Sequence, residues 1–492
     1  MDRQTDTPIP PASNLARRAI DSLTWNTTAN LLTLPISFLQ SVLLARLLSV
    51  NTFGIFAGVA ALTELVYAFF DFGLGAAATH RVPETEDEEH TMAIFFSLRL
   101  LMLTLGAFLL CGMAVIFFMD LRRQVLIVLA LSGWGLRVAM SGNVLLIRRV
   151  QHKRLALIEI LQAVLVFLLA VGIAAVTRSI WALLVAPLVQ TILFTILLYL
   201  WKPVWKPHLA WDKESVRYFL HFGYRTTIGT TLGAALDHVD DLWTNLYLGD
   251  TAMGYYSRAY RFAIYPRLLL GKPVNTVSLG MYAELKFDRP RRSRAFFQVN
   301  SLLVRSGFLL AGWLALIAPQ FIRIFLGERW LPMVTTFQLM LIYTLFDPIK
   351  LTIANLLFAV GEPEKVSLVR LVQLLVLGAG LFILGPRFGI IGVALAVDLM
   401  LIVGIALLLH HVRKHVDISL VRLFAVPTSA LVLGIGAGFV VDRLFLEGTA
   451  DWTILIIQSL VFLSLYIGLI YWVERRELIE MAREVLSNRA SI

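Results

Sequence analysis

Long apolar stretches recur along the whole chain and alternate with short polar segments. A helix of about 20 residues crosses the roughly 30 Å hydrocarbon core of a bilayer, and each stretch reaches that length. The pattern predicts an all-α integral membrane protein with about fourteen transmembrane helices. The predicted spans are residues 23–48, 53–79, 92–119, 124–146, 155–177, 179–200, 216–248, 253–284, 296–318, 333–360, 366–385, 388–410, 423–442 and 452–473.

The composition supports this class of protein and excludes others. Of the 492 residues, 58% are hydrophobic and 15% are charged, whereas about 25% of the residues of a soluble protein are charged. This rules out a water-soluble enzyme, a disordered protein and a disulfide scaffold. Cys111 is the single cysteine, so neither an intrachain disulfide nor a cysteine-cluster metal site can form. The polar first residues have no apolar core of a signal peptide, so no cleavable leader is expected.

The distribution of lysine and arginine predicts the orientation of the chain. If both termini are cytoplasmic, the cytoplasmic segments carry 25 of these residues and the outward turns carry 7. Such an excess marks the cytoplasmic side of a membrane protein. The same asymmetry explains most of the net charge of +10, so nucleic acid is not expected as a partner. The longest connection, near residues 201–215, is far shorter than a folded domain.

A short internal repeat indicates two related halves. Residues 47–60 match residues 247–260, with Gly54 aligned to Gly254. Six spans separate the copies, so both have the same orientation in the membrane. We therefore expect two pseudo-symmetric six-helix lobes plus two C-terminal helices. The predicted parts are a cytoplasmic segment 1–22, an N-lobe 23–200, a cytoplasmic linker 201–215, a C-lobe 216–410, two further spans within 423–473 and a cytoplasmic tail 474–492.

Basic residues inside the spans suggest a binding surface. A charge at the centre of a membrane helix costs roughly 2.5–3.5 kcal/mol, so such charges must face water or each other. In the span 253–284, Arg258, Arg261 and Lys272 fall within about 60° on one helix face, whereas Arg267 points the other way. This pattern predicts a cationic surface for an anionic substrate. The alternative is that each cation pairs with an acid from a neighbouring helix.

Acidic residues cluster in the preceding span. Asp237, Asp240 and Asp241 lie at positions i, i+3 and i+4, and so on one side of the helix. Three carboxylates so close together do not all ionise easily, which favours coupling to protons or cations. A structural role, in pairing with the arginines of the next span, is the alternative.

Other charges in the spans differ in their expected roles. Asp347 and Lys350, at i and i+3, are expected to form an internal ion pair. Arg137 and Asp398 stand alone in mid-span, so we expect functional roles for them. The sequence contains no G-x-x-x-x-G-K-[ST] motif, and nucleotide hydrolysis by that route is therefore not expected. No cofactor or metal is predicted.

Several stretches resemble the Wzx-type polysaccharide flippases of the multidrug/oligosaccharidyl-lipid/polysaccharide (MOP) exporter superfamily. They are ARLLSVNTFGIFA, FFDFGLGAA, LDHVDDLWTNLYLGDTAMGYYSRAYRFAIYP and LGERW. The resemblance covers nearly the whole chain and implies translocation of an undecaprenyl-diphosphate-linked oligosaccharide across the bacterial inner membrane, by alternating access around a cationic central cavity. It implies a role in exopolysaccharide, capsule or O-antigen synthesis, with a polysaccharide polymerase and a chain-length regulator as partners. Where relatives tend to carry an Ile-Gly step, this chain has Trp243 and Thr244.

Together the in-span charges and the resemblance define the candidate site. The candidate substrate-binding cations are Arg258, Arg261, Lys272, Arg137 and Arg46. The candidate ion-coupling acids are Asp237, Asp240, Asp241, Asp398 and Asp71. The main alternative function is a cation-coupled multidrug exporter of the same superfamily, whose cavity should be acidic. A membrane-embedded glycosyltransferase or ligase would need an aqueous catalytic loop, so the chain is not expected to be an enzyme.

Overall fold

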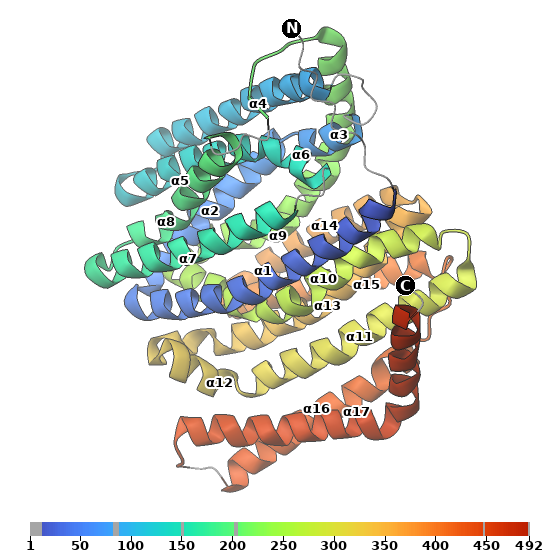
Figure 1. Cartoon of the computed structure of the whole chain (residues 1–492). Coiled ribbons are helices and arrows are strands. Elements are labelled where there is room, and N and C mark those ends of the chain that lie inside the picture. The colour runs from blue at the N-terminus through green and yellow to red at the C-terminus, as the bar shows by residue number, and fades with distance from the viewer. Residues whose placement is uncertain (1–11, 82–87, 149–151, 201–204, 446–447, 491–492) are drawn as a thin grey trace. The chain divides into compact units, whose positions relative to one another are not determined.

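The computed structural model describes residues 12–81, 88–148, 152–200, 205–445 and 448–490. All regular structure within them is helical, as the sequence predicts (Figure 1). The helices up to residue 200 are α1 (Ala12–Leu47), α2 (Val50–Phe70), α3 (Leu74–Arg81), α4 (Glu88–Phe117), α5 (Asp120–Ala139), α6 (Asn143–Arg148), α7 (His152–Thr177) and α8 (Trp181–Thr195). The later ones are α9 (Lys213–Ala263), α10 (Tyr265–Glu284), α11 (Arg289–Leu316), α12 (Ala318–Phe321), α13 (Val334–Val360), α14 (Pro363–Phe388), α15 (Ile390–Val412), α16 (Leu420–Phe445) and α17 (Asp451–Ala490).

The membrane-crossing helices are roughly consistent with the predicted pattern of about fourteen spans. In the described part of the chain, 12 helical stretches are long and apolar enough to cross a bilayer. The helices α9 and α10 are not among them, and they contain the predicted spans 216–248 and 253–284 with their closely spaced charges. These two helices are therefore more highly charged than the other predicted spans. Together they contain most of the candidate site residues.

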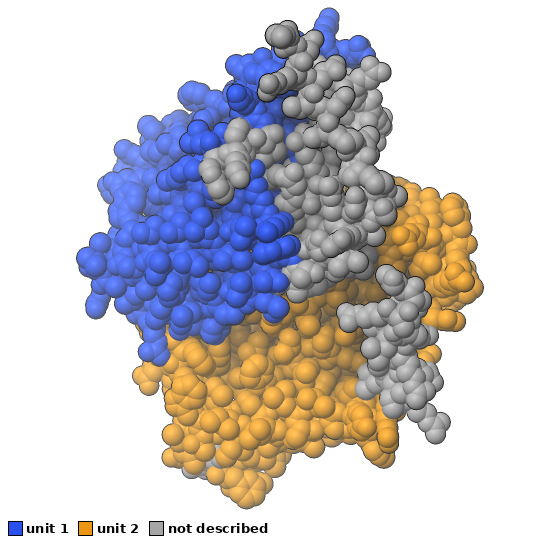
Figure 2. All heavy atoms as spheres, viewed as in Figure 1, with its two compact units in different colours: residues 1–49, 59–234 blue, residues 50–58, 235–492 orange. Residues whose placement is uncertain are grey.

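The chain divides into two compact units, coloured separately in Figure 2. Unit 1 comprises residues 1–49 and 59–234, and unit 2 comprises residues 50–58 and 235–492. Two helices contribute to both units. The first residues of α2 belong to unit 2 and its remainder to unit 1, whereas the first part of α9 belongs to unit 1 and its second part to unit 2.

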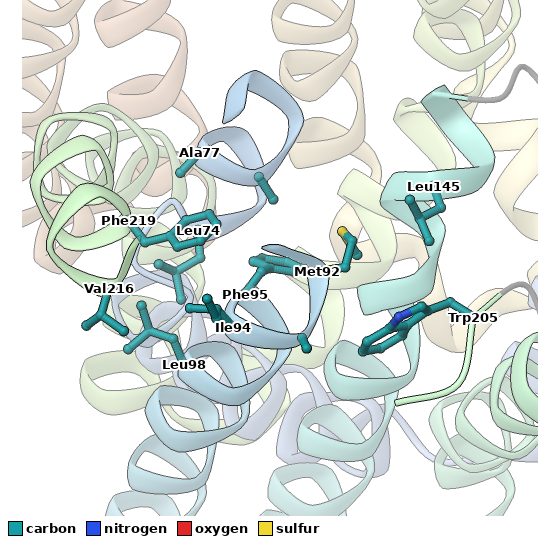
Figure 3. Close-up of a cluster of buried hydrophobic side chains, with 12 residues drawn as sticks. Leu74, Ala77, Met92, Ile94, Phe95, Leu98, Leu145, Trp205, Val216 and Phe219 are labelled. Carbon is teal, nitrogen blue, oxygen red and sulfur yellow. The ribbon is translucent and has the colours of Figure 1, made fainter. Parts of the chain in front are cut away.

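Unit 1 is held together by apolar side chains that several helices bury jointly. One cluster includes Leu74 of α3, Phe95 of α4, Leu145 of α6 and Phe219 of α9 (Figure 3). The rings of Phe95 and Phe219 lie 6.2 Å apart, a distance at which aromatic rings attract each other. This cluster fixes the short helices α3 and α6 to the long helices of the unit.

The predicted span 53–79 is interrupted in the structure, which corrects that prediction. The helix α2 ends at Phe70 and α3 begins at Leu74, and between them Phe72 and Gly73 adopt positive φ angles of 50° and 59°. A Cβ atom on Gly73 would lie 2.0 Å from Oγ1 of Thr226, so only glycine fits this close approach. The break therefore results from packing against α9, which local sequence does not encode.

Unit 2 is organised around α13. This helix packs against α10, α11 and α15, while α14 packs against α15 and α16 against α17. The candidate span that contains α13 is 67% buried, the largest buried share among the spans of the described residues. A helix surrounded in this way contacts protein along most of its length, so charged residues on it can be paired with neighbours inside the unit.

Two backbone irregularities shape the charged region of unit 2. Gly249 has a φ of 84° and kinks α9 between the predicted seventh and eighth spans. The predicted eighth span, 253–284, is not one continuous helix, because α9 ends at Ala263 and α10 begins at Tyr265. Pro266 lies in the first turn of α10, where proline is favoured because its missing N–H would have no helical partner.

Candidate functional site

The two candidate arginines of α9 occupy different surroundings. The guanidinium carbon of Arg258 lies 4.4 Å from the ring centroid of Phe53, whose ring packs edge-on against Trp330. The Nε atom of Arg258 is buried and has no hydrogen-bond partner among the described residues. Arg261, one turn further on, is exposed. Neither arginine forms an ion pair with an acid in the described part of the chain, so no acidic side chain there neutralises either charge.

The other basic residues of the predicted eighth span lie on α10. Lys272 belongs to this helix, but its side chain lies outside the described residues. Arg267, which the periodicity placed on the opposite face, has its Nε atom 3.0 Å from Oδ2 of Asp347. The predicted pair of Asp347 and Lys350 is confirmed, with Nζ 2.6 Å from Oδ1. Two cations thus share one buried carboxylate, and this cluster keeps one excess positive charge.

The three aspartates of α9 lie on one side of the helix, as their spacing predicts, and line one small cavity within unit 2. The cavity of about 20 Å³ also contacts Tyr260 and Tyr343. This volume holds about one water molecule. No group of three or more His, Cys, Asp or Glu side chains within the described residues is arranged as a metal site.

Tyr256 and Asp240 form the central contact of this acidic region. The hydroxyl of Tyr256 donates to Oδ2 of Asp240 at 2.5 Å, while Oδ1 of Asp240 is buried without a hydrogen-bond partner among the described residues. Oδ2 of the adjacent Asp241 lies 3.8 Å from Nδ1 of His238. The sequence did not identify Tyr256 as a partner of Asp240, because the two residues lie 16 positions apart.

Asp398 of α15 is a buried and unpaired acid. It is 6% exposed, and neither of its carboxylate oxygens has a hydrogen-bond partner among the described residues. The neighbouring Val397 lines the acidic cavity. Burying a carboxylate without a partner is costly unless the group is protonated or binds a cation. The prediction that Asp398 stands alone is therefore confirmed for the described part of the chain.

The remaining candidates belong to unit 1. Arg137 is not alone, which corrects the prediction: its Nη2 atom donates to Oε2 of Glu64 at 2.7 Å, and its guanidinium covers the ring of Tyr67. Asp71 accepts hydrogen bonds from Arg99 at 2.9 and 3.1 Å. Arg46 is exposed in the last turn of α1. The partners of Arg137 and Asp71 lie 73 and 28 residues away in sequence, beyond the reach of helical spacing.

A buried ion pair that the sequence did not predict joins α11 to α17. Glu474 accepts from Nε and Nη2 of Arg305 at 2.5 and 2.7 Å, and both side chains are less than 10% exposed. The hydroxyl of Tyr466 also donates to the carbonyl of Arg305. These hydrogen bonds connect α11 to α17 and so hold the last helix against unit 2. The two charges neutralise each other, so the pair offers no charge to a ligand.

Comparisons with known proteins agree on one group. A family model described as polysaccharide biosynthesis protein matches residues 43–335, more than half of the chain. The teichuronic acid biosynthesis protein TuaB of Bacillus subtilis is 20% identical over 71% of this chain and 73% of its own length. The lipopolysaccharide biosynthesis protein WzxC of Escherichia coli is 22% identical over 80% of both chains. The inward closed structure of the lipid II flippase MurJ superposes with a TM-score of 0.77 at 16% identity, covering 94% of this chain and 100% of that chain.

Proposed function

Because the chain belongs to the polysaccharide biosynthesis protein family, we propose that it is a flippase for an undecaprenyl-diphosphate-linked oligosaccharide. It moves this cargo from the cytoplasmic to the outer leaflet of the bacterial inner membrane. The family and the fold support a flippase-type transporter of the MOP exporter superfamily that acts in polysaccharide biosynthesis. The names of TuaB and WzxC, which refer to teichuronic acid and lipopolysaccharide, point to a glycan as the cargo.

The observation that carries the proposal is the pair of arginines without acidic partners, Arg258 and Arg261. A diphosphate and a hydroxylated glycan cannot cross hydrocarbon without protein groups that replace their water. Guanidinium groups bind phosphate oxygens through charge-assisted and often bidentate hydrogen bonds. We assign the diphosphate to these arginines and to Lys272. Arg46 and Arg137, the two candidate cations of unit 1, are proposed as substrate contacts of that unit. Arg137 would first have to release Glu64, for which a phosphate can compete.

The buried acids of unit 2 are the proposed ion-coupling groups. Oδ1 of Asp240 and both oxygens of Asp398 have no hydrogen-bond partner in the described part of the chain. A proton or a small cation would remove the cost of these unpaired carboxylates. Asp237 and Asp241 line the same cavity as Asp240 and join this assignment. Asp71 is the weakest candidate, because Arg99 already neutralises it.

Orientation and mechanism follow from the same proposal. The excess of lysine and arginine on the side of the membrane that carries the termini supports a cytoplasmic location for both ends of the chain. In this mechanism the six-span lobes, residues 23–200 and 216–410, would rearrange so that the substrate site opens first to one side of the membrane and then to the other. Residues 423–473 supply the two additional spans. Reporter fusions at the C-terminus test the orientation, since a cytoplasmic end gives fluorescence with green fluorescent protein and no activity with a periplasmic phosphatase.

A multidrug exporter is the second candidate, because unit 2 contains an acidic cavity. Its volume of about 20 Å³ is too small for a drug, whereas pockets for such ligands measure about 300–1,000 Å³. The cavity therefore favours a proton or a small cation as its occupant. A cationic dye distinguishes the two functions, because an exporter would move the dye and a glycan-lipid flippase would not.

The proposal is tested by reconstitution in proteoliposomes with a fluorescent undecaprenyl-diphosphate glycan. We expect wild-type protein to exchange this lipid between leaflets, and we expect Arg261→Ala to slow the exchange at least tenfold. Arg387→Ala, at an exposed position near the end of α14, is the matched control and should leave the rate unchanged. Absence of exchange in wild-type vesicles, together with dye transport, would contradict the proposal.

A further inference from the structure

A groove outside the sites described above lies in unit 2 along α10 and α13. Its volume is about 450 Å³, within the range of about 300–1,000 Å³ that is typical of small-molecule sites. The polar residues that line it are Arg267, Asn275 and Asn355. Leu268 and Leu351 line it with aliphatic surface. Gly271 lines the groove as well, and a Cβ atom there would lie 2.9 Å from Cγ of Pro348, so glycine permits the close approach of α10 to α13.

Arg267 provides fixed hydrogen-bond donors to this groove. Its Nε atom lies 3.0 Å from Oδ2 of Asp347, which orients the guanidinium. Asp347 also pairs with Lys350, so the three side chains together carry one excess positive charge. In the described part of the chain no further acid pairs with Arg267, and its terminal nitrogens can donate to a ligand.

Asn355 provides a fixed acceptor. Its Nδ2 donates to Oγ of Ser278 at 2.9 Å and to the carbonyl of Asn275 at 3.2 Å, so both N–H groups are used inside the protein. The amide oxygen of Asn355 is therefore left to accept from a ligand in this part of the groove. Nδ2 of the neighbouring Asn275 donates to the carbonyl of Gly271 at 2.9 Å, whereas its Oδ1 is buried without a donor among the described residues.

This combination selects one chemical class of ligand. A phosphate would gain from Arg267 but would meet the amide oxygen of Asn355 as a like partial charge, and an ammonium group would be repelled by Arg267. A hydroxyl group can accept from the guanidinium and donate to an amide oxygen. A sugar ring presents several hydroxyls together with C–H faces. The C–H faces can pack against Leu268 and Leu351 while the hydroxyls contact Arg267 and Asn355.

We propose that the groove of Arg267, Asn275 and Asn355 is a binding subsite for a neutral sugar unit of the cargo. This inference rests on the proposed function and adds a second contact region, separate from the arginines assigned to the diphosphate. The diphosphate arginines provide affinity for any prenyl diphosphate, and the groove provides preference for the glycosylated form.

The test compares two ligands on purified full-length protein in nanodiscs: undecaprenyl diphosphate with its glycan and bare undecaprenyl diphosphate. We expect wild type to bind the glycosylated lipid at least tenfold more tightly. Leu351→Trp fills the groove and Asn355→Ala removes an acceptor, and each should bring the affinity ratio close to one while leaving the affinity for the bare lipid unchanged. Leu375→Trp, on the exposed apolar surface of α14, is the control and should keep the wild-type ratio.

The possible outcomes separate the subsite from the proposed function. If both groove variants bind the bare lipid and keep the wild-type ratio, the subsite is wrong and the flippase proposal stands. If they weaken both lipids equally, the groove binds the phosphate, which also overturns the sugar assignment. If wild type binds neither lipid, the proposed function fails and the subsite fails with it. Thermal unfolding of each variant identifies misfolding, and Asn355→Ala provides an independent groove variant should Leu351→Trp not fold.

Discussion

Gly54 and Gly254, which are 200 residues apart, make reciprocal contacts in unit 2. A Cβ atom on Gly54 would lie 1.7 Å from the carbonyl oxygen of Asp250, and one on Gly254 would lie 2.1 Å from that of Val50. The two residues and their two partners are related by the same sequence offset. The repeated segments therefore cross each other in a two-fold-like manner, with a glycine from each at the point of closest approach.

Alanine at either glycine should destabilise this crossing. The atoms that a new methyl group would meet belong to the backbone, so they cannot move aside as a side chain could. We expect Gly54→Ala and Gly254→Ala each to reduce the free energy of unfolding by about 1–3 kcal/mol, as overpacking does. Gly378→Ala is the control, because nothing lies within 4 Å of its Cβ position. Thermal unfolding in detergent measures the difference, and equal stability of all three variants would show that the crossing tolerates a side chain.

Loss of the buried pair between Arg305 and Glu474 should detach the last helix. Removing one partner leaves an unpaired buried charge, which costs about 3–5 kcal/mol. We therefore expect Glu474→Gln to lower the unfolding midpoint strongly, and proteolysis within α17 to become faster. Asp417→Asn removes the partner of Arg289 at an exposed pair and should cost only about 0–1 kcal/mol. Equal effects of the two variants would contradict a special role for the buried pair.

The start of α9 should become less stable in acid. Asp212 precedes this helix, and its Oδ2 accepts a hydrogen bond from the backbone N–H of Ser215 at 2.8 Å. This bond holds the pKa of Asp212 below its ordinary value. The stabilisation is present above the pKa of the unfolded chain and is lost as the pH falls through the lowered folded value. The protection factors of the amides in the first turn of α9, which are exchange rates corrected for their intrinsic dependence on pH, should fall between about pH 5 and pH 2 in wild type, but not in Asp212→Asn. The same fall in that variant would assign the effect to another group.

The acidic cavity should couple transport to an ion gradient. We expect an imposed proton or sodium gradient to accelerate glycan-lipid exchange in wild-type proteoliposomes. Asp240→Asn and Asp398→Asn should each abolish the acceleration, because an amide neither releases a proton nor attracts a cation. Tyr256→Phe should change the pH at which acceleration is half-maximal, since it removes the hydroxyl that donates to Asp240. Asp417→Asn, at an exposed site, is the control; acceleration that persists in both aspartate variants would remove the coupling assignment.

The predictions that succeeded depend on residues close together in sequence. Helical spacing alone placed Asp237 and Asp240 on one side of their helix, where they line one cavity, and it joined Asp347 to Lys350. It could not find the partner of Arg137, because Glu64 lies on another helix 73 residues away. The break at Gly73 likewise depends on the nearby Thr226, which no periodicity indicates.

The most direct test of the central claim compares two cargoes in the same vesicles. Both carry the same fluorescent glycan and the same undecaprenyl chain, but one has a diphosphate linkage and the other an uncharged glycosidic linkage. If Arg258 and Arg261 bind the diphosphate, wild-type protein should exchange the charged lipid at least tenfold faster. This difference should disappear in the variant with Arg258→Gln and Arg261→Gln. Equal rates for the two lipids in wild type would contradict a cationic site for the cargo.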